Sequence, residues 1–255
     1  MQKKINKLLG DKDIAELLRG SGISFFLRIG GQSLGFLLTF IIASYFGASA
    51  LGDYILAIIV LRVFTLISKS GMDISSIRFI SSFSSRNMWT SISNFRSKTI
   101  NILCFTSIIF SITLYYLSDK ISLLINAPSE YIQASSIFVL PMSFFILNYQ
   151  SLRGLKRIAE FSFFYRMSQA LFTLILILII YQFSNDSTAP FYAYLSAVVI
   201  VSFCAFIVFR YWINRKSKDQ KSIKIDIMSY SDVLKISIPL MFAQSVQFIM
   251  AWTDK

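Results

Sequence analysis

Three arginines and one glutamine lie inside long apolar stretches of this sequence, where charged and amide groups are unusual. They are Arg28, Gln32, Arg62 and Arg166. Arg28 and Gln32 are four residues apart and therefore share one face of a helix. The planar guanidinium group of arginine can pair with two oxygens of one phosphate. Because an ionised side chain within a membrane is a functional-site hypothesis by default, these residues indicate binding of an anionic substrate.

A simpler interpretation of the three arginines also stays open. Each lies about two helical turns, or ~10 Å, from the basic end of its predicted span. At that depth the long arginine stem can reach back to the membrane interface at a modest cost. In that case the charge would serve only to anchor the helix.

The elements that position these residues are predicted membrane helices. The chain has 255 residues, of which 55% are hydrophobic and 25 are phenylalanine. A helix of about 20 apolar residues is long enough to cross the hydrocarbon core of a bilayer. The sequence therefore predicts an all-α polytopic membrane protein with seven spans, the last of them incomplete: 23–46, 51–69, 99–118, 131–150, 159–182, 191–213 and 233–252.

Three local features modify this pattern. Gly31 and Gly35 form a small-xxx-small spacing, which allows another helix to approach closely. Pro141 lies in the middle of the fourth span and is expected to kink it. Residues 70–98 mix apolar residues with serines and basic residues, and are predicted to lie along the membrane surface.

The basic residues are distributed unevenly along the chain. Twenty of the 25 lysines and arginines lie in the segments 1–22, 69–98, 153–157 and 210–235, whereas the opposite loops contain only Lys120. This asymmetry predicts a cytoplasmic N-terminus. It also explains the net charge of +12 by topology and by contact with anionic membrane lipids, and no nucleic-acid partner is predicted.

Several kinds of chemistry are disfavoured. The chain has no histidine, which removes histidine-based catalytic triads and histidine metal sites. It has no P-loop, no dinucleotide-binding fingerprint and no zinc-ligand spacing, so no cofactor is predicted. The loops opposite the basic segments are only about 4–13 residues long, which is short for catalytic loops. The chain is therefore not predicted to be an enzyme, although a membrane glycan polymerase is kept as an alternative.

The seventh span resembles the first at an offset of 212 positions, which places Gln32-Ser33 over Gln244-Ser245 and Phe36 over Phe248. Six spans lie between the two starting points, so both helices run in the same direction. A parallel repeat of two six-helix halves has this property. The predicted organisation is a cytoplasmic segment 1–22, a six-span lobe 23–213, a cytoplasmic linker 214–232 and the first span of a second lobe, 233–255.

Four stretches carry a resemblance to a known family: Tyr45–Gly47 with Gly52–Tyr54, Gly71–Ile80, Tyr149–Arg157 and Trp252–Lys255. They look like the turn after span one, the segment after span two, the basic loop after span four and the end of span seven in oligosaccharide-lipid flippases of bacterial polysaccharide biosynthesis. Those proteins belong to the multidrug/oligosaccharidyl-lipid/polysaccharide superfamily, together with MATE-type drug extruders and the lipid II flippase.

The resemblance implies a MATE-like fold and a transport function. By alternating access of two lobes, the protein would flip an undecaprenyl-pyrophosphate-linked oligosaccharide across the bacterial inner membrane, for O-antigen or capsule biosynthesis. A glycan polymerase and a chain-length regulator would be its protein partners. The lipid II flippase has functionally important arginines in its cavity, so the resemblance makes Arg28, Gln32, Arg62 and Arg166 candidate substrate-binding residues.

Two further alternatives stay open. A MATE-type drug or cation antiporter would favour buried carboxylates, and no Asp or Glu is predicted in the middle of a span. The chain also ends at Asp254-Lys255, within the first span of the predicted second lobe. An inactive truncated fragment is therefore the other alternative.

Overall fold

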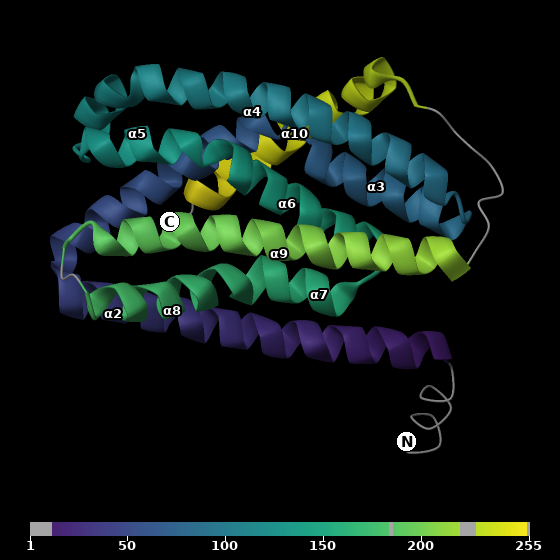
Figure 1. Ribbon diagram of the computed structural model, residues 1–255, viewed down its shortest axis with the longest axis horizontal. Helices are drawn as coiled ribbons and strands as arrows, with labels where there is room; N and C mark the ends of the chain where they lie inside the picture. The colour runs from purple at the N-terminus through teal and green to yellow at the C-terminus, as the bar shows by residue number, and fades with distance from the viewer. Residues whose placement is uncertain (1–11, 184–185, 220–227, 254–255) are drawn as a thin grey trace.

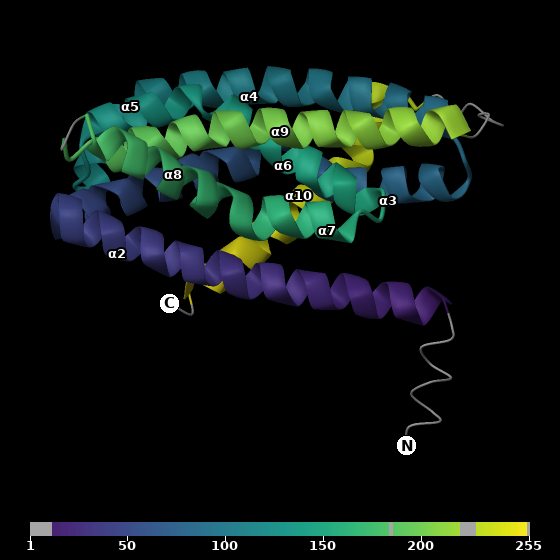
Figure 2. The same cartoon turned by 60° about the horizontal axis from the view of Figure 1, so that its bottom comes forward.

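The computed structural model of the protein is a bundle of long helices that run roughly along one axis (Figures 1 and 2). It describes residues 12–183, 186–219 and 228–253. The first half of the predicted N-terminal segment, the middle of the predicted linker and the end of the chain at Asp254-Lys255 lie outside the described residues.

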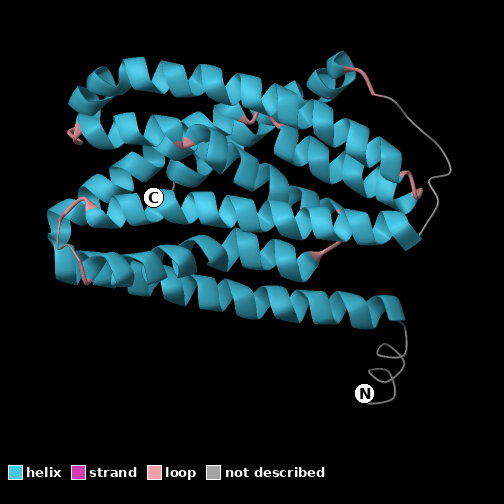
Figure 3. Cartoon of the chain, in the orientation of Figure 1, coloured by secondary structure: helices cyan, strands magenta, loops and turns pink. Residues whose placement is uncertain are grey.

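All regular structure in the described residues is helical (Figure 3), which confirms the predicted all-α class. The elements in chain order are α2 (Lys12–Ser68), α3 (Met72–Ser85), α4 (Trp89–Ile125), α5 (Ser129–Ile137), α6 (Val139–Gly154), α7 (Ile158–Ser162), the π-helix η1 (Phe163–Ser168), α8 (Gln169–Tyr181), α9 (Ala189–Asp219) and α10 (Tyr230–Thr253).

Each of the seven predicted spans coincides, to within a residue at its ends, with part of one helix or with consecutive helices. Four helical segments are long and apolar enough to cross a membrane, and the bent pair α5–α6 makes a fifth if it counts as one span. The first of the four, Gly20–Ser68, has 49 residues and contains two predicted spans. The protein is therefore a polytopic membrane protein.

Helix α2 consists of two arms joined by a sharp bend at Gly47, where the chain turns back toward the end from which it came (Figures 1 and 2). Gly47 has φ 90° and ψ 163°, a backbone conformation that only glycine adopts readily. The first arm, residues 20–46, and the second arm, residues 48–68, correspond to the first two predicted spans.

Residues 70–98 do not form the predicted surface segment. Helix α3 continues in the direction of the second arm of α2, away from the bend at Gly47 (Figure 1). Helix α4 already begins at Trp89. Met72, Ile80 and Phe83 of α3 are buried, and α3 packs against α6 and α4. The prediction was wrong because the serines of this segment suggested a water-exposed surface. Small hydroxyl side chains also allow close helix packing inside a membrane protein.

The fourth predicted span is bent, as Pro141 indicated. Helices α5 and α6 meet at an angle of 51°, with the break at Phe138. Pro141 is the third residue of α6, where its missing N–H leaves the carbonyl group of Ile137 without a helical partner. The helix consequently breaks within one turn of the proline.

The two ends of the bundle differ in charge. The bend of α2 and the α4–α5 and α8–α9 connections lie at one end, and the α3–α4 and α6–α7 connections lie at the other (Figure 1). We call the second of these the basic end, because it carries Arg86, Arg153, Lys156, Arg157, Arg215 and Lys216. The opposite end carries Asp53, Asp119, Lys120, Glu130 and Asp186.

Buried serines connect the helices at the centre of the bundle. The Ser68 hydroxyl lies 2.7 Å from the Ser107 hydroxyl and 3.2 Å from the Ser143 hydroxyl. All three side chains are buried, and they come from α2, α4 and α6. Such hydrogen bonds hold membrane helices together where apolar contact gives little preference for protein over lipid.

Candidate functional site

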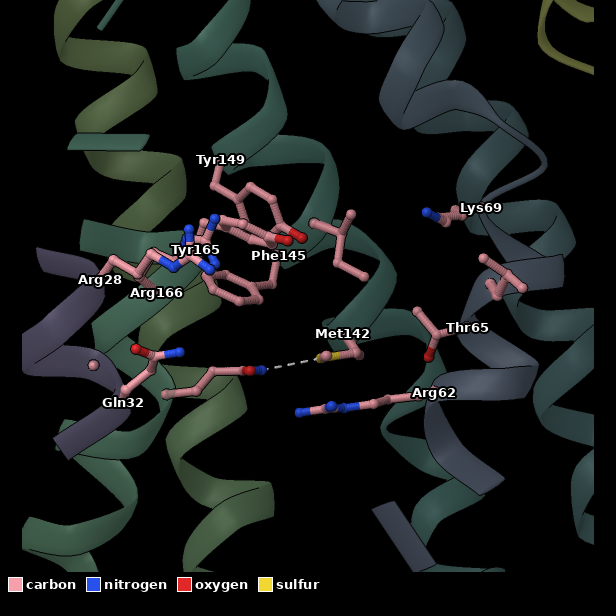
Figure 4. A pocket seen from close by; sticks show the side chains of 14 residues that line it. Arg28, Gln32, Arg62, Thr65, Lys69, Met142, Phe145, Tyr149, Tyr165 and Arg166 are labelled. Atoms are coloured by element: carbon pink, nitrogen blue, oxygen red, sulfur yellow. Dashed lines mark hydrogen bonds between the residues drawn. The ribbon is translucent and has the colours of Figure 1, made fainter. Parts of the chain in front are cut away.

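The four side chains singled out in the sequence line one cavity of about 470 Å³ (Figure 4). Arg28 and Gln32 come from the first arm of α2, Arg62 from the second arm, and Arg166 from η1. The structure thus brings together residues that are up to 138 positions apart in the sequence. Their role in substrate binding stays a prediction.

The cavity contains more positive than negative charge. Lys69 also lines it, and it forms the one ion pair found among the described residues, with Asp73. Arg28, Arg62 and Arg166 have no carboxylate partner within that part of the chain. Three arginines without a carboxylate partner in a cavity of a membrane-spanning bundle favour an anionic occupant.

Arg62 lies deeper than the sequence suggested. Span two was expected to end at Lys69, which put Arg62 two turns from the basic end. Because the span continues through α3 to Ser85, Arg62 is 23 residues from that end, a path of roughly 35 Å. An arginine side chain cannot cover this distance, so snorkelling to the interface at the basic end does not explain Arg62.

Close packing between α2 and η1 brings Arg28 and Arg166 to the same wall. A Cβ atom added to Gly31 would overlap the Arg166 carbonyl oxygen and lie 2.8 Å from the Arg166 carbonyl carbon. The predicted close helix contact is therefore present at Gly31. At Gly35, the other glycine of the predicted spacing, an added Cβ atom would meet nothing within 4 Å.

The partner segment in this contact is not a regular α-helix. Residues 163–168 have the wider turn of a π-helix, which sequence patterns did not indicate. Single π-turns inside α-helices occur frequently at functional sites. Here the π-turn contains Arg166, whose guanidinium group lies 4.7 Å from the centre of the Tyr165 ring.

The cavity has a neighbour toward the opposite end of the bundle. This second chamber, of about 350 Å³, shares Arg62, Tyr165, Arg166 and Gln169 with the first. Its remaining lining includes Tyr54 and Tyr194 near the far ends of their helices. The shared arginines therefore lie at the junction of two chambers that follow the bundle axis.

A buried carboxylate lies beside the cavity, which the sequence analysis did not anticipate. Asp73 was assigned to a surface segment, but only 1% of its side chain is exposed. Its Oδ2 atom lies 2.5 Å from Lys69 Nζ and accepts a hydrogen bond of 2.8 Å from Gln244 Nε2 of α10. A buried acidic group thus lies close to the cavity, although Asp73 is outside the helical segments that are long and apolar enough to cross a membrane.

The same region joins α10 to the rest of the bundle. Ser70 and Gly71, which separate α2 from α3, have φ values of 47° and 72°. A Cβ atom at Gly71 would lie 2.7 Å from the Met241 nitrogen of α10. The Ser237 hydroxyl of α10 donates a hydrogen bond of 2.9 Å to the Ser75 hydroxyl. Helix α10 thus packs against the chain at the break between α2 and α3.

We expect Lys69 and Asp73 to be energetically coupled. Asp73→Asn alone leaves a buried ammonium group without its counter-charge, whereas Lys69→Met combined with Asp73→Asn removes both charges. A double-mutant cycle on the thermal unfolding of the purified protein should give a coupling energy of about 1–3 kcal/mol. A coupling energy of zero within error would show that the ion pair contributes nothing to stability.

Several lining residues were not selected from the sequence as binding residues: Lys69, Tyr149, Tyr165 and Gln169. The Gln169 Nε2 atom lies 3.3 Å from the Met142 sulfur, so this side chain connects α8 to α6. The pairing of Lys69 with Asp73 could have been predicted, because opposite charges four residues apart pair on one helical face. The positions of Tyr149 and Tyr165 in the cavity could not have been predicted, since tyrosine is common near membrane interfaces.

The chain was compared with protein-family models, with curated proteins and with solved structures, and none of the three comparisons gave a match.

Proposed function

We propose that the protein flips a lipid-linked oligosaccharide, carried on undecaprenyl pyrophosphate, across the bacterial inner membrane. The observation that carries this proposal is the set of three arginines without carboxylate partners, Arg28, Arg62 and Arg166, around one cavity. A pyrophosphate offers several anionic oxygens close together. Arginines on opposite walls of one cavity can pair with such a group from both sides.

The other lining residues suit the rest of such a headgroup. Gln32 and Gln169 supply amide groups, which can donate to and accept from sugar hydroxyls. Tyr149 and Tyr165 lie 5.6 Å apart between ring centres and add an aromatic wall. These groups would replace the water that the sugars and phosphates lose inside the bilayer, where an unpaired polar group is costly.

The two adjoining chambers support a path along the bundle. In the proposed orientation the basic end lies in the cytoplasm, because basic residues accumulate on that side of bacterial membranes. The headgroup would enter the cavity from there and move past Arg62 and Arg166 toward the opposite end of the bundle. The lipid tail would stay in the surrounding bilayer.

Alternating access between two lobes is the proposed mechanism, in line with the resemblance to oligosaccharide-lipid flippases. Helix α10 would be the first helix of the second lobe, and a parallel repeat of the six preceding spans would follow. A glycan polymerase and a chain-length regulator are the proposed partners in O-antigen or capsule biosynthesis. The breaks at Gly71, Phe138 and η1 lie next to the cavity and are sites where helix arms can change angle.

A second candidate is an antiporter for drugs or organic cations. Buried Asp73 favours it, because a carboxylate in a membrane span can bind a cation or a proton. Asp73 is already paired with Lys69, however, so the cavity as a whole keeps its positive excess. The flippase therefore has the stronger support.

A transport assay distinguishes the two candidates. The full chain is reconstituted into liposomes that contain a fluorescent undecaprenyl-pyrophosphate oligosaccharide, and the label in each leaflet is measured with a membrane-impermeant quencher. We expect the protein to move the lipid between leaflets faster than protein-free liposomes do. Export of ethidium without movement of the labelled lipid would contradict the flippase and support the antiporter.

A further inference from the structure

A second polar cavity lies between α4 and α9 and shares no residue with the chambers described above. Its volume is about 410 Å³. Each wall is a single helix face, because its residues recur at spacings of three and four. The α4 wall consists of Ser93, Arg96, Ser97, Ile100 and Asn101. The α9 wall consists of Phe206, Phe209, Arg210, Ile213 and Asn214.

Arg96 is held in a defined position on the α4 wall. Its guanidinium group donates hydrogen bonds to the Asn148 side-chain oxygen and, over 3.3 Å, to the Ser151 hydroxyl. The same group lies 3.9 Å from the centre of the Phe209 ring. A guanidinium oriented by hydrogen bonds and an aromatic face loses little freedom when it binds an anion.

Arg210 faces this arrangement from the α9 wall. Its side chain is exposed, and it forms neither an ion pair nor a hydrogen bond with any residue that the structure describes. Ser97, Asn101 and Asn214 add hydroxyl and amide donors to the same cavity. Two cations, several donors and no carboxylate in the lining match the chemistry of a phosphate group.

The depth of the cavity indicates where that phosphate comes from. Helix α4 has 37 residues and is therefore ~55 Å long, whereas the hydrocarbon core of a bilayer is about 30 Å thick. Roughly 12 Å of a centred α4 would extend into the headgroup region on each side. Arg96 is seven residues from the first residue of α4, or ~10 Å, and so lies at the level of lipid headgroups at the basic end.

Exposed apolar residues continue both walls toward the middle of the bundle. On α4 the next exposed residues are Phe105, which is 68% exposed, and Ile108. On α9 they are Phe203, which is 64% exposed, and Val199. A phosphate bound in the cavity would thus have an apolar surface beside it on the bilayer side, where acyl chains can lie.

From these observations we propose that the α4–α9 cavity binds the phosphate headgroup of an anionic phospholipid, with Arg210 and Arg96 as its cationic partners. A zwitterionic lipid is disfavoured because the cavity lining contains no acidic residue for its ammonium group. Free phosphate is disfavoured because it would not use the apolar surface. The site is separate from the proposed transport path, so it can be tested independently.

Native mass spectrometry of the full chain in detergent tests this site. The protein is titrated separately with dioleoylphosphatidylglycerol, dioleoylphosphatidylcholine and glycerol 3-phosphate, and the bound fraction is measured for each. We expect phosphatidylglycerol to bind most tightly. Arg210→Gln should weaken that binding about tenfold or more, because it removes a charge-assisted pair. Arg210→Lys should keep part of it.

Arg86→Gln is the matched control, since Arg86 is an exposed cation at the same end but outside the cavity. It should change phosphatidylglycerol binding less than about twofold, as expected for a general surface charge. Arg210 is exposed, so its replacement should leave the unfolding temperature unchanged, whereas Arg96 connects α4 to α6 and is avoided. Equal binding of the two phospholipids, an unaffected Arg210→Gln variant, or equally tight glycerol 3-phosphate would each overturn the proposal.

Discussion

Replacing Gly31 with alanine should separate α2 from η1 and abolish transport. The added methyl group would overlap the Arg166 carbonyl oxygen, and backbone atoms cannot move aside as a flexible side chain can. Either the helices shift apart or the contact region distorts, at a cost of about 1–3 kcal/mol. Both outcomes move Arg166 relative to Arg28. We expect a lower unfolding temperature together with loss of transport in liposomes.

Gly35→Ala is the control for this change, because the same substitution one turn later meets nothing within 4 Å. It should keep the contact between α2 and η1 and stabilise the helix slightly, by up to about 1 kcal/mol, so the unfolding temperature should not fall. If Gly31→Ala and Gly35→Ala behave alike, the close contact between α2 and η1 is not what positions the arginines.

Arg28→Ala should abolish glycan export in cells while the amount of protein in the membrane stays normal. Arg28 lines the cavity without a carboxylate partner among the described residues, so its removal leaves no buried charge unpaired. The loss of one charge-assisted contact to the pyrophosphate should reduce transport about tenfold or more. Export is measured by surface glycan staining, and protein level by immunoblot of membranes.

Two companion variants define what Arg28 contributes. Arg28→Lys keeps the charge but loses the planar fork, and should therefore restore transport only partly. Arg86→Ala removes an exposed arginine at the basic end and should have no effect. Full export by Arg28→Ala would sink the assignment of Arg28 to the substrate.

The all-α membrane class and the arginines that line the cavity could be predicted from the sequence. Apolar stretches of the length of a bilayer give helices with little ambiguity, since backbone groups in lipid must pair within the helix. A charged residue in such a stretch must face protein or water. That reasoning selected Arg28, Arg62 and Arg166 from different spans, and all three line the cavity.

The bend near Pro141 could be predicted, but the π-turn and the continuation of α2 into α3 could not. The π-turn at residues 163–168 packs closely against Gly31, which is 135 positions away from Arg166, so its main contact is distant in the sequence. The extension of span two through α3 depends on serines that are buried only because α6 and α10 cover them. Such contacts are decided by tertiary structure, whereas the local sequence of Gly71–Ser85 is compatible with a membrane surface.

The wrong prediction of a surface position for α3 changed the predicted site as well as the predicted fold. A surface position for residues 70–98 hid the buried pair Lys69–Asp73 and its contact with Gln244 of α10. It also placed Arg62 too close to the basic end, which left snorkelling to the interface at that end as an interpretation. With α3 placed inside the bundle, Arg62 lies at the junction of the two chambers.

Direct binding of a prenyl pyrophosphate is the measurement that tests the central claim, that the arginine-lined cavity holds an anionic lipid-linked headgroup. Calorimetry on the purified full chain would compare farnesyl pyrophosphate with uncharged farnesol and with tetraphenylphosphonium. We predict that only the pyrophosphate binds specifically. A variant in which Arg28, Arg62 and Arg166 are all glutamine should bind it about 100-fold more weakly or worse. Equal binding of farnesol, preference for the organic cation, or unchanged affinity of the triple variant would contradict the account.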